Sequence, residues 1–347
     1  LIGDANLPTG LKFKGTDFGG LSGLAFDPLT SELRIISDDR SERQPARFYS
    51  ARLTGEGNHL RFVPVAYSTL LGRKGVPFPK GALDPEGIAI LGSRMFVASE
   101  GSAKSGPRIM PAILELNESG RELGRLAIPE KFLPELRGTQ TQGTPNNGAF
   151  ESLSISPTEK FLFTATESPL IQDDTPAGFK KGGMSRILVY ALEGDRRVPK
   201  TEYVYVTEPN AKPEGATEDY GNGVSEVLAL GERTLLVLER GAAATPTGVK
   251  NRIRIFKTIL GNDGATNVAR FRSLKGKKFT PLKKELILDL DSILPDLDRN
   301  FRSTDNLEGM AFGPRLPNGN RTLVLISDNN FNPLQRTQIL AFEIRKE

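Results

Sequence analysis

Two acidic side chains bracket an apolar hairpin in the stretch LDPEGIAILGSRMFVASEG, residues 83–101. Glu86 comes just before the apolar run 88–90, and Glu100 comes just after the run 95–98. If the two runs are antiparallel strands joined by a tight turn at 91–94, both carboxylates lie at the same edge of the hairpin. An apolar hairpin does not need this charge, so the pair is a candidate for binding a hard cation.

The plan of this hairpin recurs five times along the chain. Each copy has a polar or acidic residue, a short apolar strand, a turn rich in Gly, Pro or Ser, a second apolar strand and a closing acid. The intervals between opening positions, 64 to 82 residues, leave room for four strands per copy. The opening position holds Ser22, Glu86, Glu151, Glu226 and Glu308, and the closing position holds Asp38, Glu100, Glu167, Glu239 and Asp328.

The repeat predicts an all-β chain folded as a single β-propeller domain with five blades. A third and a fourth strand can be read in the first four copies, whereas the fifth copy lacks its fourth strand. We expect the N-terminal segment 10–15, GLKFKG, to pair beside 338–344 and so to close the ring. A sixth blade would need strands that the sequence does not show, and a large β-sandwich is the alternative fold. The expected blades are approximately 16–80, 81–145, 146–220, 221–300 and 301–347 with 8–15.

Composition excludes several classes of site. The chain of 347 residues has no cysteine and one histidine, His59, so thiolate sites, a cysteine nucleophile and a histidine-rich zinc site are ruled out. A Ser-His-Asp triad would have to use His59. Neither a G-x-S-x-G elbow nor a P-loop occurs, which counts against a typical α/β-hydrolase and a P-loop NTPase.

Charge and hydropathy bear on partners and location. The net charge of +4 gives little support to a nucleic-acid groove, and the basic run at 275–278 is interpreted as a solvated loop. No apolar stretch reaches the roughly 18 residues needed to span a bilayer. The chain begins with Leu1 rather than methionine, so we expect an export signal to have been removed and the protein to be secreted or periplasmic. We also expect a monomer.

In a propeller the opening and closing positions face the same mouth of the central channel. Nine carboxylates and one serine would then surround this mouth, and like charges at close range raise one another's pKa. Ca²⁺, which takes six to eight oxygen ligands, suits such a ring. Internal pairing with arginines in the same loops is the alternative, and for a single acid it is the commoner outcome. The arginines are Arg40, Arg240 and Arg336, and neutral oxygens are available from Asn147, Asn306, Asn329 and Asn330.

The stretches GGLSGLAFDP, IISDD, DPEGIAI, FESLSIS, NLEGMAF and LISDNN resemble the phytase-like family, which is labelled for an esterase-like activity of phytase. The resemblance extends from about Gly19 to Ile344. It implies an exported bacterial β-propeller, distantly related to the six-bladed, calcium-dependent phytases.

The resemblance also implies roles for particular residues in phosphoester hydrolysis. Ca²⁺ would be held by Asp38, Asp39, Glu86, Glu100, Glu151, Glu167, Glu226, Glu239, Glu308 and Asp328, with Glu86, Glu100, Glu151 and Glu308 as the catalytic carboxylates. Phosphate oxygens would be held by Arg40, Arg108, Lys180, Lys181, Arg240 and Arg336. The ligand would be a small phosphoester or another anion, with no nucleic acid involved. A calcium-centred lactonase or esterase and a non-enzymatic binding propeller are the competing functions.

Overall fold

The computed structural model describes residues 1–56, 59–104 and 107–345, and nearly all of its regular structure is β. Two short 3₁₀ helices lie in the long connections, η1 (Glu130–Phe132) and η2 (Leu290–Asp296). Among the described residues no helix is long and apolar enough to cross a bilayer.

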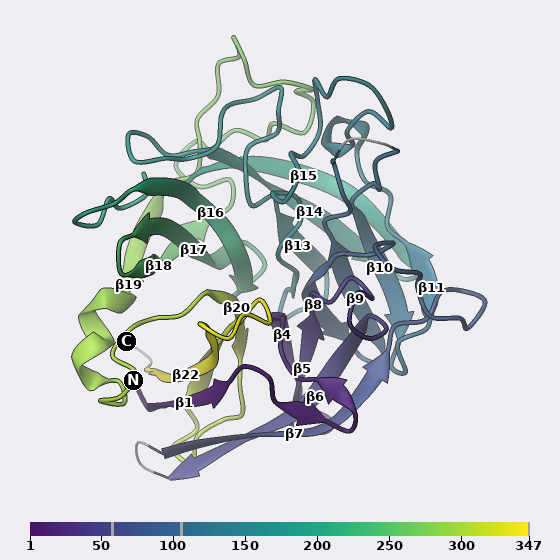
Figure 1. Cartoon of the computed structure of the whole chain (residues 1–347). Coiled ribbons are helices and arrows are strands. Elements are labelled where there is room, and N and C mark those ends of the chain that lie inside the picture. Colours follow the sequence, from purple (N-terminus) through teal and green to yellow (C-terminus); the bar gives the residue numbers. More distant parts are fainter. Residues whose placement is uncertain (57–58, 105–106, 346–347) are drawn as a thin grey trace. The chain divides into compact units, whose positions relative to one another are not determined.

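The strands form five antiparallel blades, and the chain is a five-bladed β-propeller (Figure 1). Blade one contains β4 (Leu21–Asp27), β5 (Glu32–Ser37), β6 (Arg47–Glu56) and β7 (His59–Thr69). Blade two contains β8 (Pro85–Leu91), β9 (Arg94–Ser99), β10 (Ala112–Asn117) and β11 (Glu122–Arg125). Blade three contains β12 (Ser154–Ile155), β13 (Phe161–Ala165), β14 (Met184–Glu193) and β15 (Arg196–Val206).

Blade four contains β16 (Glu218–Ala229), β17 (Thr234–Thr245), β18 (Gly248–Ile259) and β19 (Lys284–Asp289). Blade five contains β20 (Leu307–Phe312), β21 (Arg321–Ser327) and β22 (Arg336–Ile344). The second strands, such as β9 and β17, are mostly buried and have a hydrogen-bonded strand on both sides. The last two residues of the expected fifth blade, 346–347, lie outside the described part of the chain.

The N-terminal strand completes blade five, as expected, but a different segment does so. β1 (Gly3–Pro8) pairs antiparallel with β22, from Gly3 opposite Ala341 to Pro8 opposite Arg336. The expected segment 10–15 instead forms half of a small hairpin, in which β2 (Lys12–Phe13) pairs with β3 (Thr16–Asp17). The reason is local, because Gly10 and Gly15 have φ values of 93° and 84°, which a continuous strand cannot accommodate.

The chain divides into two compact units. Unit one contains Leu1–Val97, Glu115–Gly124 and Leu290–Glu347, and unit two contains Ala98–Leu114 and Arg125–Asp289. The core of unit one packs residues of blades one and five, such as Leu24, Tyr49 and Val324. The core of unit two packs residues of blades three and four, such as Phe163 and Val237. The expected single domain and its blade boundaries stay a prediction.

Glycines after the opening positions allow the first strands of unit one to approach closely. A Cβ on Gly23 would lie 2.4 Å from the carbonyl oxygen of Glu86, and a Cβ on Gly309 would lie 2.9 Å from the carbonyl oxygen of Ser22. Strands β20, β4 and β8 can therefore lie beside one another only with glycine at these places. This packing brings Ser22, Glu86 and Glu308 onto neighbouring strands.

Candidate metal centre

Backbone hydrogen bonds join the opening and closing positions within a blade. The amide of the closing acid donates to the carbonyl two residues before the opening position. The same bond occurs from Asp38 to Gly20 (2.8 Å), from Glu167 to Ala149 (2.8 Å) and from Asp328 to Asn306 (3.0 Å). The first two strands of each of these blades thus place both positions at one edge.

The opening position is also a place where the strand is irregular. In three blades the register shifts there, so that Ser22, Ser225 and Glu308 are each the extra residue of a β-bulge. Such bulges redirect a side chain and are common beside functional sites. In blade four the bulged residue is Ser225, and the predicted Glu226 lies one residue farther along, opposite Leu238.

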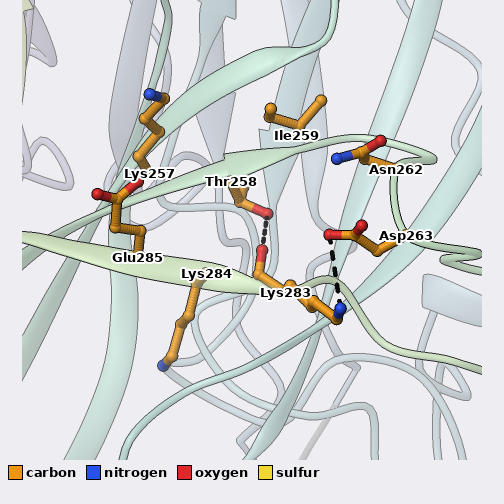
Figure 2. Close-up of a pocket in the computed structure, with 8 residues that line it drawn as sticks. All are labelled: Lys257, Thr258, Ile259, Asn262, Asp263, Lys283, Lys284 and Glu285. Carbon is orange, nitrogen blue, oxygen red and sulfur yellow. Dashed lines mark hydrogen bonds and ion pairs between the residues drawn. The ribbon is translucent and has the colours of Figure 1, made fainter.

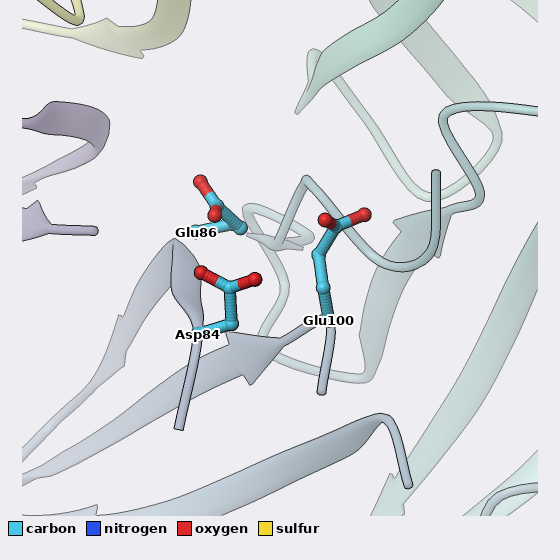
Figure 3. Close-up of side chains that lie close together, drawn as sticks. All are labelled: Asp84, Glu86 and Glu100. Carbon is cyan, nitrogen blue, oxygen red and sulfur yellow. The ribbon is translucent and has the colours of Figure 1, made fainter. Parts of the chain in front are cut away.

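Three carboxylates converge at the end of the β8–β9 hairpin. Asp84, Glu86 and Glu100 are all buried, and one oxygen from each lies within 4.8 Å of the others (Figure 3). Glu86 and Glu100 therefore lie close together, as the hairpin arrangement predicts. Asp84 was missed, although its position two residues before Glu86, separated by Pro85, was a usable signal.

Asp38 adds a fourth carboxyl to this acidic environment. Its Oδ1 is buried and has no hydrogen-bond partner, and Gly20 packs against it closely enough to leave no room for a Cβ. Burial, together with the negative charges of Glu308 and Asp84, raises the pKa of Asp38 to about 7 against the opposing effect of Arg40. Asp38 is thus influenced by acids from blades two and five.

Arg40 is the cation that faces these acids. Its Nε donates to Asp84 Oδ1 at 2.6 Å, and its charge also acts on Glu86 and Asp38. A third of its side chain stays exposed. Arg40, which was predicted to bind phosphate, therefore lies beside the carboxylates and forms an ion pair with Asp84.

The acids of blade five have partners from their own loops. Asn306 Nδ2 donates to Glu308 Oε1 at 2.9 Å, and Asp328 Oδ1 accepts the amide of Asn330 at 2.7 Å. Asn329, which was expected to offer an oxygen, uses its Oδ1 to accept the amides of Gly20 and Phe331. Asn306 thus presents its nitrogen rather than its oxygen to Glu308.

Asp39, next to Asp38 in sequence, has a different role. Its two oxygens accept the amides of Glu42, Arg43 and Gln44 and a 2.7 Å bond from the buried Arg47. Burial would raise the pKa of Asp39, but these hydrogen bonds outweigh it and lower the pKa. Asp39 therefore organises the turn that follows β5, and we leave it out of the candidate centre.

In unit two the closing acid of blade four is fully paired. Glu239 Oε1 accepts bonds from Tyr205 (2.7 Å) and Lys284 (2.6 Å), and Oε2 accepts from Asn222 (2.7 Å) and the amide of Glu208 (2.9 Å). The side chain is completely buried. With both oxygens occupied by donors, Glu239 has no lone pair aimed at a further ligand.

The other acids of unit two also have donors close by. Glu167 Oε1 accepts from Arg240 at 2.9 Å, although burial still raises the pKa of Glu167. Glu226 Oε1 accepts the amide of Leu153 at 3.2 Å, and Glu100 Oε1 accepts the amide of Ala149. Glu151 is buried at the start of blade three.

The remaining predicted phosphate-binding residues are in structural roles or are exposed. Arg108 donates to the carbonyls of Ala103, Glu135 and Gly138, which ties two loops together. Arg336 bonds to Asn6 and Ser303 and lies 3.5 Å from Asp305. Lys181 pairs with Asp174 at 2.6 Å, and Lys180 is exposed.

A shallow depression of about 200 Å³ lies at the base of the β18–β19 connection (Figure 2). Two of its charged residues pair with each other, since Lys283 lies 3.8 Å from Asp263. Lys284 contributes to the lining, but its Nζ turns away and reaches Glu239. The depression contains none of the predicted site residues.

The residues around Asp84 fit a hard divalent cation. The donors are all oxygens, three of them lie within 4.8 Å of one another, and Asp38 holds a buried oxygen that has no partner. Arg40 offers one positive charge to Asp38, Asp84 and Glu86. A cation would add positive charge among these carboxyl groups and could be coordinated by Asp38 Oδ1.

The fold and this centre define a five-bladed β-propeller with buried carboxylates at the strand ends of its repeats. The chain belongs to the phytase-like family, described as "esterase-like activity of phytase", whose model matches residues 16–331. No curated protein sequence matches it.

Two solved structures can be superimposed over most of the chain at low identity. An endo-arabinase from Bacteroides thetaiotaomicron VPI-5482 is 13% identical, with 98% of this chain and 97% of that one covered and a TM-score of 0.48. A candidate 6-phosphogluconolactonase from Bacteroides uniformis ATCC 8492 is 10% identical, with 96% and 90% covered and a TM-score of 0.33. Similarity at this level supports no conclusion about activity.

Proposed function

We propose that this protein is a calcium-dependent phosphoester hydrolase. The observation that carries the proposal is the set of three buried carboxylates, Asp84, Glu86 and Glu100, whose oxygens lie within 4.8 Å of one another. Membership of the phytase-like family supports the reaction class. Asp38 and Glu308 would complete the negative charge around the ion.

The donor set favours calcium over other biological metals. Zinc and copper sites draw on cysteine and histidine, whereas the chain has no cysteine and its one histidine, His59, belongs to another strand end. Calcium tolerates carboxylate ligands at flexible geometry, while magnesium requires near-octahedral geometry and retains water. Calcium is therefore the first ion to test.

The chain's own residues would bind and orient the substrate. Bound Ca²⁺ would hold phosphate oxygens and make a water molecule more acidic. Arg40, with a third of its side chain exposed, can donate to a phosphate oxygen while Asp84 fixes its Nε. The glycines at 23 and 309 keep the first strands close, so that the carboxylates they carry remain near one another.

The experiment compares the rate of hydrolysis of phytate and of an aryl phosphate, with calcium and with chelator. We expect calcium-dependent hydrolysis by the wild type and a loss of more than about 100-fold in Glu86→Gln, since removing one metal ligand removes transition-state charge stabilisation. The matched control is Glu118→Gln, which removes the same charge from an exposed residue. A wild type that hydrolyses neither substrate in calcium would refute the proposal.

The Arg40–Asp84 ion pair favours a second candidate, a propeller that binds a ligand without catalysis. In that case Arg40 neutralises the acids, and Glu86→Gln would lower stability with no activity to lose. A lactone and a carboxylic ester belong in the same substrate panel, because hydrolysis of these alone would indicate a lactonase or esterase. Export and a monomeric state stay predictions.

A further inference from the structure

The connection between β18 and β19, residues 260–283, is much longer than a hairpin requires. Hairpin loops commonly have two to five residues. This connection also carries six basic residues and one acidic residue. Since the whole chain has a net charge of +4, the rest of the chain has a net charge of −1. The positive excess is therefore concentrated in one connection.

The connection is held against the outer strand of blade three. Val268, Leu274 and Leu282 are buried, and Val204 of β15 packs with the first two. The amide of Val268 donates to Glu202 (2.8 Å) and the amide of Leu282 donates to Val204 (2.9 Å). The segment thus has a fixed course over the edge of β15. Figure 1 shows it in pale green, extending beyond the strands of its own sheet.

The anchors present a cluster of exposed cations. The amide of Lys277 closes a turn onto Leu274 at 3.1 Å, and Gly276 takes the φ of 70° that this turn needs. Leu274 is fixed below the turn by a 2.8 Å bond from its amide to Asp173. The exposed cations, which we name the basic turn, are Arg270, Lys275, Lys277 and Lys278.

The basic turn has no carboxylate partner among residues 1–56, 59–104 and 107–345. Its neighbours Arg272 and Lys283 do have one, since Arg272 lies 3.4 Å from Glu130 and Lys283 lies 3.8 Å from Asp263. None of the four lines the depression of Figure 2. Charges that are concentrated, held in place and left without counter-charge are suited to an external anion.

We propose that the basic turn docks this protein onto an anionic phospholipid bilayer. Three of its four cations are lysines, which act as point charges and suit a diffuse negative surface better than a bidentate site. The aromatic residues of the connection, Phe271 and Phe279, pack toward Val204 and Leu274, so they do not offer the stacking platform of a single-stranded nucleic-acid site. The proposal is independent of the hydrolase proposal.

The experiment measures partition of the full chain onto vesicles of phosphatidylglycerol and phosphatidylcholine by flotation at low salt. We expect binding that rises with phosphatidylglycerol content, is absent on pure phosphatidylcholine and weakens as salt is raised. Lys275→Gln/Lys277→Gln/Lys278→Gln should lower the partition coefficient by about 100-fold, because each lysine near an anionic surface contributes about 5-fold.

The matched control removes the same charge elsewhere. Lys74, Lys80 and Lys250 are exposed and carry no ion pair among the described residues, so Lys74→Gln/Lys80→Gln/Lys250→Gln should bind within a few fold of wild type. Equal loss in both triple variants, or no binding of wild type to anionic vesicles, would overturn the proposal. Binding to heparin or duplex DNA without binding to vesicles would also overturn it, in favour of a soluble polyanion.

Discussion

The closing carboxylates of blades one and four occupy the same place in the repeat but differ in their surroundings. Glu239 in blade four is completely buried and receives four hydrogen bonds of 2.6 to 2.9 Å, one of them from Lys284. Asp38 in blade one has a buried oxygen with no partner, and its pKa is raised to about 7. One position of the repeat is therefore neutralised internally, and the other is not.

The difference arises from residues outside the two-stranded hairpin that carries the opening and closing positions. Lys284 is the first residue of β19, and Tyr205 lies near the end of β15, so both come from outer strands. In blade one the nearby cation is Arg40, but its Nε donates to Asp84 rather than to Asp38. The same acidic position is therefore balanced in different ways: by residues of the outer strands in blade four, and only in part by a loop arginine in blade one.

The largest expected effect is on the stability of unit two. Glu239→Gln removes the charge that balances Lys284, which is largely buried. Breaking one partner of such a pair costs several kcal/mol, and since Lys284 keeps Glu208 at 3.0 Å we expect about 3 kcal/mol. Chemical denaturation gives the free energy of unfolding.

A second variant separates lost pairing from a general packing defect. In Glu239→Gln/Lys284→Met the stranded cation is removed, so we expect part of the lost stability to return. A double variant that is as unstable as the sum of its parts would show that the pair is not coupled, and the contrast with Asp38 would weaken.

Calcium should distinguish the two regions with a slightly smaller effect. A ligand that binds only the folded state stabilises by RT ln(1 + [L]/Kd), about 2.7 kcal/mol at a hundredfold excess over Kd. We expect this increment in wild type and in Glu239→Gln, and its loss in Glu86→Gln. Thermal melting in chelator and in millimolar calcium measures this increment. An unchanged midpoint in wild type would show that calcium does not bind the folded protein.

The sequence predicts the fold well because the repeat is a property of local pattern. Short apolar strands, turn residues and a closing acid recur in every blade, and the absence of a fourth strand in the fifth copy pointed to closure by the N-terminus. The closing segment was misplaced because Gly3–Pro8, GDANLP, consists largely of Gly, Asp, Asn and Pro, which are depleted in strands. Its pairing depends on the edge that β22 offers rather than on its own composition.

The candidate centre was predicted only in part. Glu86 and Glu100 were found from their spacing, but Asp84 was missed because it lies outside the opening and closing positions. The internal pairing of Glu239 could not be anticipated, since Lys284 is 45 residues away and reaches it across the sheet. Spacing shows which acids share an edge, whereas the partners of each acid depend on tertiary packing.

The last prediction concerns the pH dependence of stability caused by Asp38. Because burial and the neighbouring carboxylates raise the pKa of this carboxyl from 3.8 to about 7, the folded chain keeps the proton over a range in which the unfolded chain releases it. The free energy of unfolding of the metal-free protein should therefore fall as pH rises from about 4 to about 7, and it should change little above. Asp38→Asn keeps the shape of the neutral acid, so its free energy of unfolding should not show this fall with pH. In chelator we expect the variant to match wild type at pH 4 and to exceed it by about 2 kcal/mol at pH 8, which is less than the full linkage value because neighbouring carboxyls share the repulsion. The measurement is the free energy of unfolding in urea between pH 4 and pH 8. The contrasting variant is Asp39→Asn. Asp39 has a lowered pKa and donors on both oxygens, so its variant should be less stable than wild type above pH 4. If Asp38→Asn loses stability at pH 8 in chelator, its carboxylate has a cationic partner in the folded protein, and the contrast with Glu239 fails.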